Sequence, residues 1–204
     1  GLPIYESVVV TWIVMAVLVL LSIILVRNLK VENPGKKQLA LEAGYLFFRN
    51  FFYNLLGEHG ARYIPYMITI VLYIGLANIM GVFGFVPPTK DMGVTIALAL
   101  MSIILIEYSG IHQKVTKGWL KSFAEPIPIM LPINILEIGI RPLSLCMRLF
   151  GNVLGSYVVM KLVEIICPIL LPVPFNLYFD FFDGFIQAYV FVFLTSLFIS
   201  EAVE

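Results

Sequence analysis

The sequence predicts an all-α integral membrane protein with five transmembrane helices and an amphipathic interfacial helix. The chain has 204 residues, of which 60% are hydrophobic, and its mean hydropathy is +0.97. A water-soluble domain of this length cannot bury so much apolar surface, because its surface-to-volume ratio is too high. In addition, five apolar stretches approach or exceed the roughly 20 residues that a helix needs to cross about 30 Å of hydrocarbon.

The predicted spans cover residues 5–26, 64–86, 94–111, 130–166 and 175–203. The last two are too long for an upright helix at about 1.5 Å per residue, so they must tilt steeply, kink or lie partly along the membrane. Pro142 removes one backbone hydrogen bond and should bend the fourth helix. Between the first two spans, residues 36–58 mix apolar and charged side chains. This pattern favours a helix in the interface plane over a loosely packed cytoplasmic helix.

The chain divides into three predicted regions. Residues 1–62 carry the first span and the amphipathic helix, residues 63–129 carry the middle pair of spans, and residues 130–204 form a long tilted hairpin. The first apolar run has no Lys or Arg before it, which favours a true span over a cleavable signal peptide. Basic residues are concentrated in residues 27–62 and in the loop after the third span, and this predicts an N-terminus outside and a C-terminus in the cytoplasm.

The remaining composition narrows the function. The 13 basic and 13 acidic residues balance, so nothing indicates a nucleic-acid partner. Cys146 and Cys167 lie in apolar surroundings, which favours a reduced packing role over a disulfide or a metal site. His112 has no second ligand at metal spacing. We therefore expect neither a metal nor a cofactor.

Ionisable residues inside the last two spans are the strongest functional signal, because charges in hydrocarbon are costly and usually functional. The fifth span carries Asp180, Asp183, Gly184 and Gln187 on one face. At the α-helical spacing, one face of the fourth span carries small, polar or charged residues: Glu137, Arg141, Ser144, Arg148, Gly151, Asn152 and Gly155.

The depth of these groups sorts them into three levels. Arg148 and Asn152 lie near the middle of the fourth span, and Glu137 and Arg141 lie nearer its cytoplasmic end. The outer ends of the two spans carry Glu164, Asp180 and Asp183. The sequence thus predicts acids opening outward, an acid opening inward and a permanent cation between them.

Structural alternatives apply to several of these residues. Glu137 and Arg141 are spaced i,i+4, so a simple ion pair and a functional role are equally open for them. For Lys161 we favour a side chain that snorkels to the outer interface. Arg148 could tie helices together. However, the acids on its own helix are too distant to pair with it, so a functional role is favoured.

The run IRPLSLCMRLFGNVLGS at residues 140–156 resembles the signature of subunit a of F-type ATP synthases, in which a basic–Pro pair precedes SLxxRLFGN. IQAYVFVF at residues 186–193 resembles the family's QAFVF segment on its last helix. Weaker similarity covers residues 77–100, where ANIMGVFGFVP leads into a D-x-x-VT stretch. Together these segments extend the resemblance over most of the chain after Arg62.

The resemblance implies roles for individual residues. Arg148 would be the stator arginine that faces the ring of c subunits, and Asn152 and Gln187 match polar residues of the same site. Asp180 matches the ionisable position seven residues before the glutamine, which helps to form the outer half-channel. Tyr157 departs from the family, because relatives often carry an acid or another polar group nine residues after the arginine. The remaining candidates are Asp183, Glu164, Glu137 and Ser144 along the ion pathway, with Asn78, Arg141 and Tyr157 in support.

The function implied by the resemblance is that of a non-catalytic, ion-translocating stator subunit in a bacterial plasma membrane. Its expected partners are c-ring proteolipids, peripheral-stalk b subunits, membrane lipid and the translocated H⁺ or Na⁺. The alternative is a self-contained ion channel or secondary transporter, although the paired broken helices of many transporters are not evident. The sequence has no HExxH, no GxSxG and no paired Asp motif of a membrane protease, which argues against an intramembrane enzyme.

Overall fold

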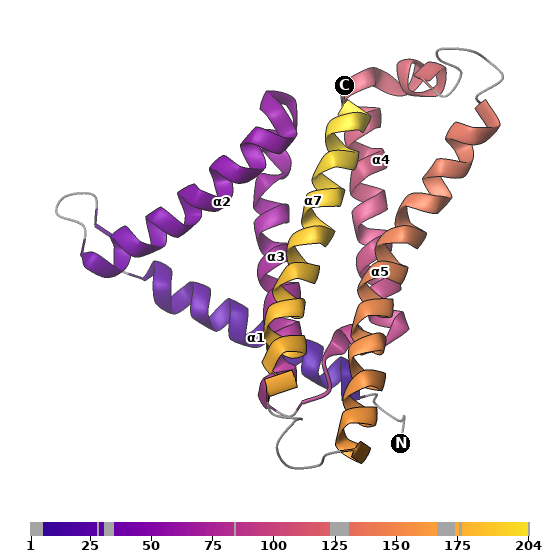
Figure 1. Ribbon diagram of the computed structural model, residues 1–204. Helices are drawn as coiled ribbons and strands as arrows, with labels where there is room; N and C mark the ends of the chain where they lie inside the picture. The colour runs from indigo at the N-terminus through magenta and orange to yellow at the C-terminus, as the bar shows by residue number, and fades with distance from the viewer. Residues whose placement is uncertain are drawn as a thin grey trace, which may run out of the picture.

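The structure is a computed structural model that describes residues 6–27, 29–30, 35–83, 85–122, 131–166, 174–175 and 177–203. The side chains of residues 82, 83, 115–122 and 180 lie outside this description, as does Cys167. The N-terminal helices are α1 (Glu6–Val26) and α2 (Lys36–Gly60), and the bundle consists of α3 (Ile64–Ile79), α4 (Met92–Ser122), α5 (Leu131–Ile166) and α7 (Gly184–Val203) (Figure 1). Short turns of other helix types are η1 (Ala61–Tyr63), η2 (Met80–Phe83), η3 (Pro88–Lys90) and η5 (Leu177–Asp183).

Five helical stretches are long and apolar enough to cross a membrane, as the sequence predicts. They are Glu6–Val26, Lys36–Ile79, Met92–Lys114, Leu131–Ile166 and Leu177–Val203. The described regular structure is helical throughout, which confirms the predicted all-α fold. The second stretch differs from the prediction, because α2, η1 and α3 follow one another within 44 residues. The position of α2 in the interface plane stays a prediction.

α7 is the central helix of the bundle. It packs against α2, α3 and α4, and Figure 1 shows it in yellow among them. Large side chains on α7, such as Phe191 and Ile199, are almost completely buried. They meet Phe52 and Leu56 of α2 and the apolar side of α3 in one continuous core. Burial of these side chains contributes packing even within a bilayer, because protein interiors are denser than lipid chains.

α5 lies at the edge of the bundle and packs mainly against α4. Its buried residues are Leu145, Cys146, Leu149 and Met160, and the Cys146 thiol lies 3.5 Å from the Thr95 hydroxyl of α4. The helix continues through Pro142 over 36 residues, which corresponds to about 54 Å at 1.5 Å per residue. Because only one side of α5 is covered, the other side remains open to the surroundings.

Asp91 fastens the start of α4, and this gives a structural reason for the D-x-x-VT stretch. One carboxylate oxygen of Asp91 accepts a hydrogen bond from the Gly93 backbone N–H at 2.9 Å, as a helix-capping residue does. The other oxygen accepts a hydrogen bond from the Ser7 hydroxyl at 2.5 Å. Asp91 therefore joins the first turn of α1 to the first turn of α4.

The chain enters α7 through a π-helical turn, which the sequence did not predict. Residues Leu177–Asp183 form η5, whereas residues 175–203 were expected to have α-helical spacing throughout. At the junction, the Asn78 side-chain amide donates a hydrogen bond to the Gly184 carbonyl at 3.0 Å. The Asn78 side-chain oxygen accepts a hydrogen bond from the Thr89 hydroxyl at 2.7 Å. Because π-helical turns are uncommon and concentrate at functional sites, this junction marks the region of interest.

We expect Gly184→Ala to destabilise the protein, because an added Cβ would lie 2.7 Å from the Asn78 Cβ. Forcing a methyl group into such a contact costs about 1–3 kcal/mol. The change should appear as a lower midpoint of thermal unfolding in detergent. Gly151→Ala is the matched control, because a Cβ at that position meets nothing within 4 Å. Equal stability of the two variants would show that the close approach of Asn78 to Gly184 is wrong.

Candidate functional site

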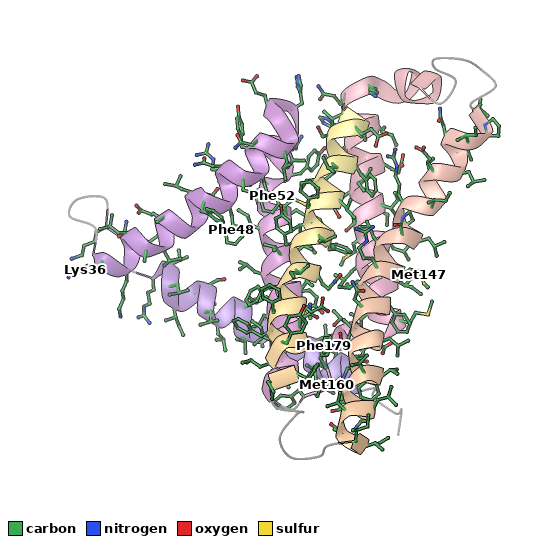
Figure 2. All side chains as sticks on the ribbon, viewed as in Figure 1. Lys36, Phe48, Phe52, Met147, Met160 and Phe179 are labelled. Atoms are coloured by element: carbon green, nitrogen blue, oxygen red, sulfur yellow. The ribbon has the colours of Figure 1, made fainter. Side chains whose placement is uncertain are left out.

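The open side of α5 carries most of the stripe that the sequence predicts. Three of its members, Ser144, Arg148 and Asn152, are exposed. Glu137 is also exposed and lies about two helical turns before Ser144. The apolar neighbour Met147 is 50% exposed and projects away from the bundle, as Figure 2 shows. We call this surface the arginine face; its members are Glu137, Ser144, Arg148, Gly151, Asn152 and Gly155.

Glycines make the arginine face shallow. A Cβ added at Gly139, Gly151 or Gly155 would meet no atom within 4 Å. Packing against the described part of the chain therefore does not explain these glycines. Small residues at such positions let a second helix approach closely in a membrane. The arginine face therefore has room for added atoms at Gly151 and Gly155.

Arg148 has no hydrogen bond or ion pair with any residue that the structure describes. It lies near the middle of a 36-residue apolar helix, where an unpaired charge is expensive. A guanidinium stays protonated under all physiological conditions, so neutralisation cannot relieve the penalty. Its compensating negative charge must therefore come from outside the described part of this chain.

A pocket with a mixed polar and apolar lining lies between the end of α3, the segment from η2 to η3, α5 and η5. Its volume is about 180 Å³, which is enough for several water molecules. Two of the predicted outer acids, Glu164 and Asp183, line it together with Asn78 and Tyr157. We call it the acidic pocket; its other polar lining residues are Lys90, Ser156 and Lys161.

Tyr157 is the centre of a charged group at the rim of the acidic pocket. The Lys90 ammonium lies 4.3 Å from the centroid of its ring, and the Lys161 ammonium lies 5.8 Å from the same centroid. Lys161 also pairs with Glu164 at 2.8 Å. The predicted snorkelling lysine is therefore held by its own helix. The tyrosine that replaces an acid in the family pattern is a cation-binding ring here.

Gln187 lies inside the bundle and contacts Asp183, a lining residue of the acidic pocket. It is only 6% exposed, and its side-chain amide donates a hydrogen bond to Asp183 at 3.4 Å. Asn152 was predicted to share a site with Gln187, but it is exposed on the arginine face. The structure thus connects Gln187 to Asp183, and places Asn152 on a different surface. Asp180 belongs to η5, and its side chain lies outside the described part of the molecule.

Arg141 forms two ion pairs at the opposite end of α5. Its Nη2 atom lies 3.2 Å from Glu137 Oε2 and 3.0 Å from Glu201 Oε1 of α7. The guanidinium also stacks over the Phe198 ring at 5.1 Å. We call these residues the Arg141 cluster. The i,i+4 pair was one of the two open alternatives, whereas Glu201 was missed because its contact requires α7 to run antiparallel to α5.

Arg148 separates the two acidic regions along α5. Glu137 precedes it by 11 residues, or about 16 Å of helix rise, and Val153 of the acidic pocket follows it by five residues, or about 8 Å. Glu137 and the acidic pocket therefore lie on opposite sides of Arg148 along α5. Among the described residues, no group of three His, Cys, Asp or Glu side chains could hold a metal ion.

Comparison with known proteins identifies the family. The family model described as the ATP synthase A chain matches residues 8–200. The ATP synthase subunit a of Moorella thermoacetica is 36% identical over 204 residues, which cover 100% of this chain and 93% of the relative. The sodium-ion-specific ATP synthase subunit a of Propionigenium modestum is 32% identical, over 100% of this chain and 75% of the relative. A subunit a of Hahella chejuensis is 34% identical, over 100% and 86% respectively. The chain therefore belongs to the ATP synthase subunit a family, whose members are membrane subunits of the complex and not its catalytic subunits.

Proposed function

We propose that this chain is the ion-translocating stator of a rotary ATP synthase, with Arg148 as the residue that separates two half-channels. The observation that carries the proposal is the exposed Arg148 side chain, which has no partner among the described residues on a glycine-lined surface. The missing negative charge is supplied by a carboxylate on each subunit of a c-ring of proteolipids. The glycines of the arginine face admit the ring helix to close range.

The fixed charge of Arg148 controls the ionisation of the ring carboxylates. A carboxylate that faces lipid must be neutral, because an isolated charge in hydrocarbon is strongly unfavourable. Beside a guanidinium the ionised form is favoured, because an opposite charge lowers the carboxylate pKa. Arginine cannot relay the proton itself, so it also blocks direct leakage between the two sides of the membrane.

The two half-channels correspond to the two acidic regions on either side of Arg148. The acidic pocket, with Glu164 and Asp183, supports an entrance from outside, and Asp180 on η5 belongs to the same entrance. Glu137 and Ser144 are exposed on the other side of Arg148 and support an inner exit. Each ion that moves through about 100 mV releases about 2.3 kcal/mol, which biases rotation of the ring.

The distribution of basic residues supports the membrane orientation. Most lie on one side of the predicted spans, which places the N-terminus outside and the C-terminus in the cytoplasm of a bacterial plasma membrane. Peripheral-stalk b subunits hold the stator against the torque of the ring. The translocated ion is H⁺ or Na⁺, and the ligands that distinguish them belong to the ring and not to this chain.

Arg148→Ala is expected to lower ion-driven ATP synthesis by at least about 100-fold, because removal of one preorganised charge from an active site has effects of this size. Synthesis is measured in inverted membrane vesicles, normalised to the amount of chain in the purified complex. Arg49→Ala is the control, since Arg49 is also an exposed cation but lies on α2. ATP synthesis near the normal rate in the Arg148 variant would end the assignment.

Reconstitution of the chain alone distinguishes a stator from a self-contained channel. Liposomes that contain only this chain should show no ion uptake, because the stator has no mobile carboxylate of its own. Addition of the c-ring and the remaining membrane subunits should restore uptake. Rapid uptake by the isolated chain would instead support the channel or secondary transporter.

The double variant Asp183→Asn, Glu164→Gln should slow passive ion flux through membranes stripped of the catalytic sector by about tenfold or more, the scale of lost proton-transfer groups. Both replacements retain shape and hydrogen-bonding capacity, so the pocket should keep its structure. Glu58→Gln removes an exposed carboxylate on α2 and should leave the flux unchanged. An unaltered flux in the double variant would contradict the role of the acidic pocket.

A further inference from the structure

We propose that Glu137 and Glu201 together form the ion-release site on the cytoplasmic side, and that Arg141 is the positioning residue that holds the two carboxylates side by side. This inference rests on the proposed stator function and adds to it a residue on the last helix. Its basis is that two carboxylates from antiparallel helices meet a single guanidinium.

The geometry makes the two carboxylates near-equivalent. Glu137 and Glu201 contact the same nitrogen, Arg141 Nη2, at 3.2 and 3.0 Å. Their contacting oxygens are therefore within about 6 Å of each other, and two carboxylates around one guanidinium leave the cluster with one net negative charge. One acid can be fully paired while the other accepts a proton or a cation.

The three side chains differ in exposure: the Arg141 guanidinium is mostly buried, and the two carboxylates are exposed. The Arg141 side chain is 17% exposed, whereas the side chains of Glu137 and Glu201 are 48% and 62% exposed. Arg141 is further held against the Phe198 ring at 5.1 Å, a contact that stabilises cations. The cation is thus anchored between α5 and α7, and the carboxylates reach water.

The depth of the cluster suits ion release. Glu137 is 11 residues from Arg148 on one continuous helix, a rise of about 16 Å. Half of a hydrocarbon core is about 15 Å. Tilt of α5 makes the depth difference smaller than this rise, so the Arg141 cluster lies between Arg148 and the predicted cytoplasmic end of the helix, on the path of an ion that leaves the membrane.

The ion passes through the cluster in two transfers. A protonated ring carboxyl on the inner side of Arg148 gives its proton, through water, to whichever of Glu137 and Glu201 is less tightly paired with Arg141. That carboxylic acid then releases the proton to cytoplasmic water and pairs again. A sodium ion would instead bind between the oxygens of the two carboxylates. Because either acid can act, loss of one is compensated by the other.

A simple clasp between α5 and α7 is the competing explanation, and a set of isosteric variants separates the two. Glu137→Gln and Glu201→Gln are each expected to lower passive ion flux less than about twofold. The double variant should lower the flux about tenfold or more, because the effects of residues that share one task are strongly non-additive. Arg141→Gln keeps both carboxylates and should stay within about threefold of normal, because it only loosens their placement. A variant that combines Glu137→Gln with Glu201→Asp keeps one carboxylate, so it should have most of the normal flux.

The measurement is passive flux in vesicles stripped of the catalytic sector, normalised to the amount of assembled complex. Glu42→Gln serves as the control, since it removes an exposed carboxylate from α2, where Gln38 can still bond the new amide. An Arg141→Gln variant as impaired as the double variant would establish a clasp, and additive losses would show that the two acids do not share one task; either result would overturn the proposal. Normal flux in the double variant would overturn it as well. If Arg148→Ala abolishes flux while the double variant does not, the stator function stands and only the release site fails.

Discussion

The guanidinium of Arg148, which has no ion pair with any described residue, is the constraint on which the rest of the structure depends. A permanent cation on an exposed surface of a membrane helix is stable only when another molecule brings a negative charge to it. The fold is arranged to keep that surface available. α5 is held from one side by Leu145, Cys146 and Leu149, and on the opposite side a Cβ added at Gly151 or Gly155 would meet no described atom within 4 Å.

The two helices α5 and α7 differ in how they are packed. α7 is buried among α2, α3 and α4 and acts as the rigid reference for the bundle. α5 is bound to it at one end by the Arg141 cluster and borders it at the other end through the acidic pocket. Acids therefore occur at both ends of the helix pair, and the central part of α5 keeps an exposed surface.

Local features of the sequence predicted much of this structure. The boundaries of α1 and α5 agree with the predicted spans to within one residue, because long apolar runs leave little choice of helix ends in a membrane. The Glu137–Arg141 pair could be read from its i,i+4 spacing. The proposed role of Arg148 comes from the family resemblance and stays a prediction.

The parts that sequence could not predict depend on contacts between distant segments. Glu201 is 60 positions after Arg141, and only the antiparallel packing of α5 and α7 brings the two together. The acidic pocket likewise combines residues of α3, α5 and η5. The π-helical turn has no simple sequence signal, and the hydrogen bonds beside it join Gly184 to Asn78 and Asn78 to Thr89, which are distant in the sequence from the turn.

The π-helical turn also shows how this site could change during evolution. A π-helical turn accommodates one residue more than the α-helix around it, so it behaves as a single-residue insertion absorbed within a helix. Deletion of one residue from Leu177–Asp183 would restore α-helical geometry without disturbing α7. Every side chain before the deletion would then turn by about 100° around the helix axis. A lineage could in this way redirect the acids of the outer entrance while the buried half of the same helix keeps its packing.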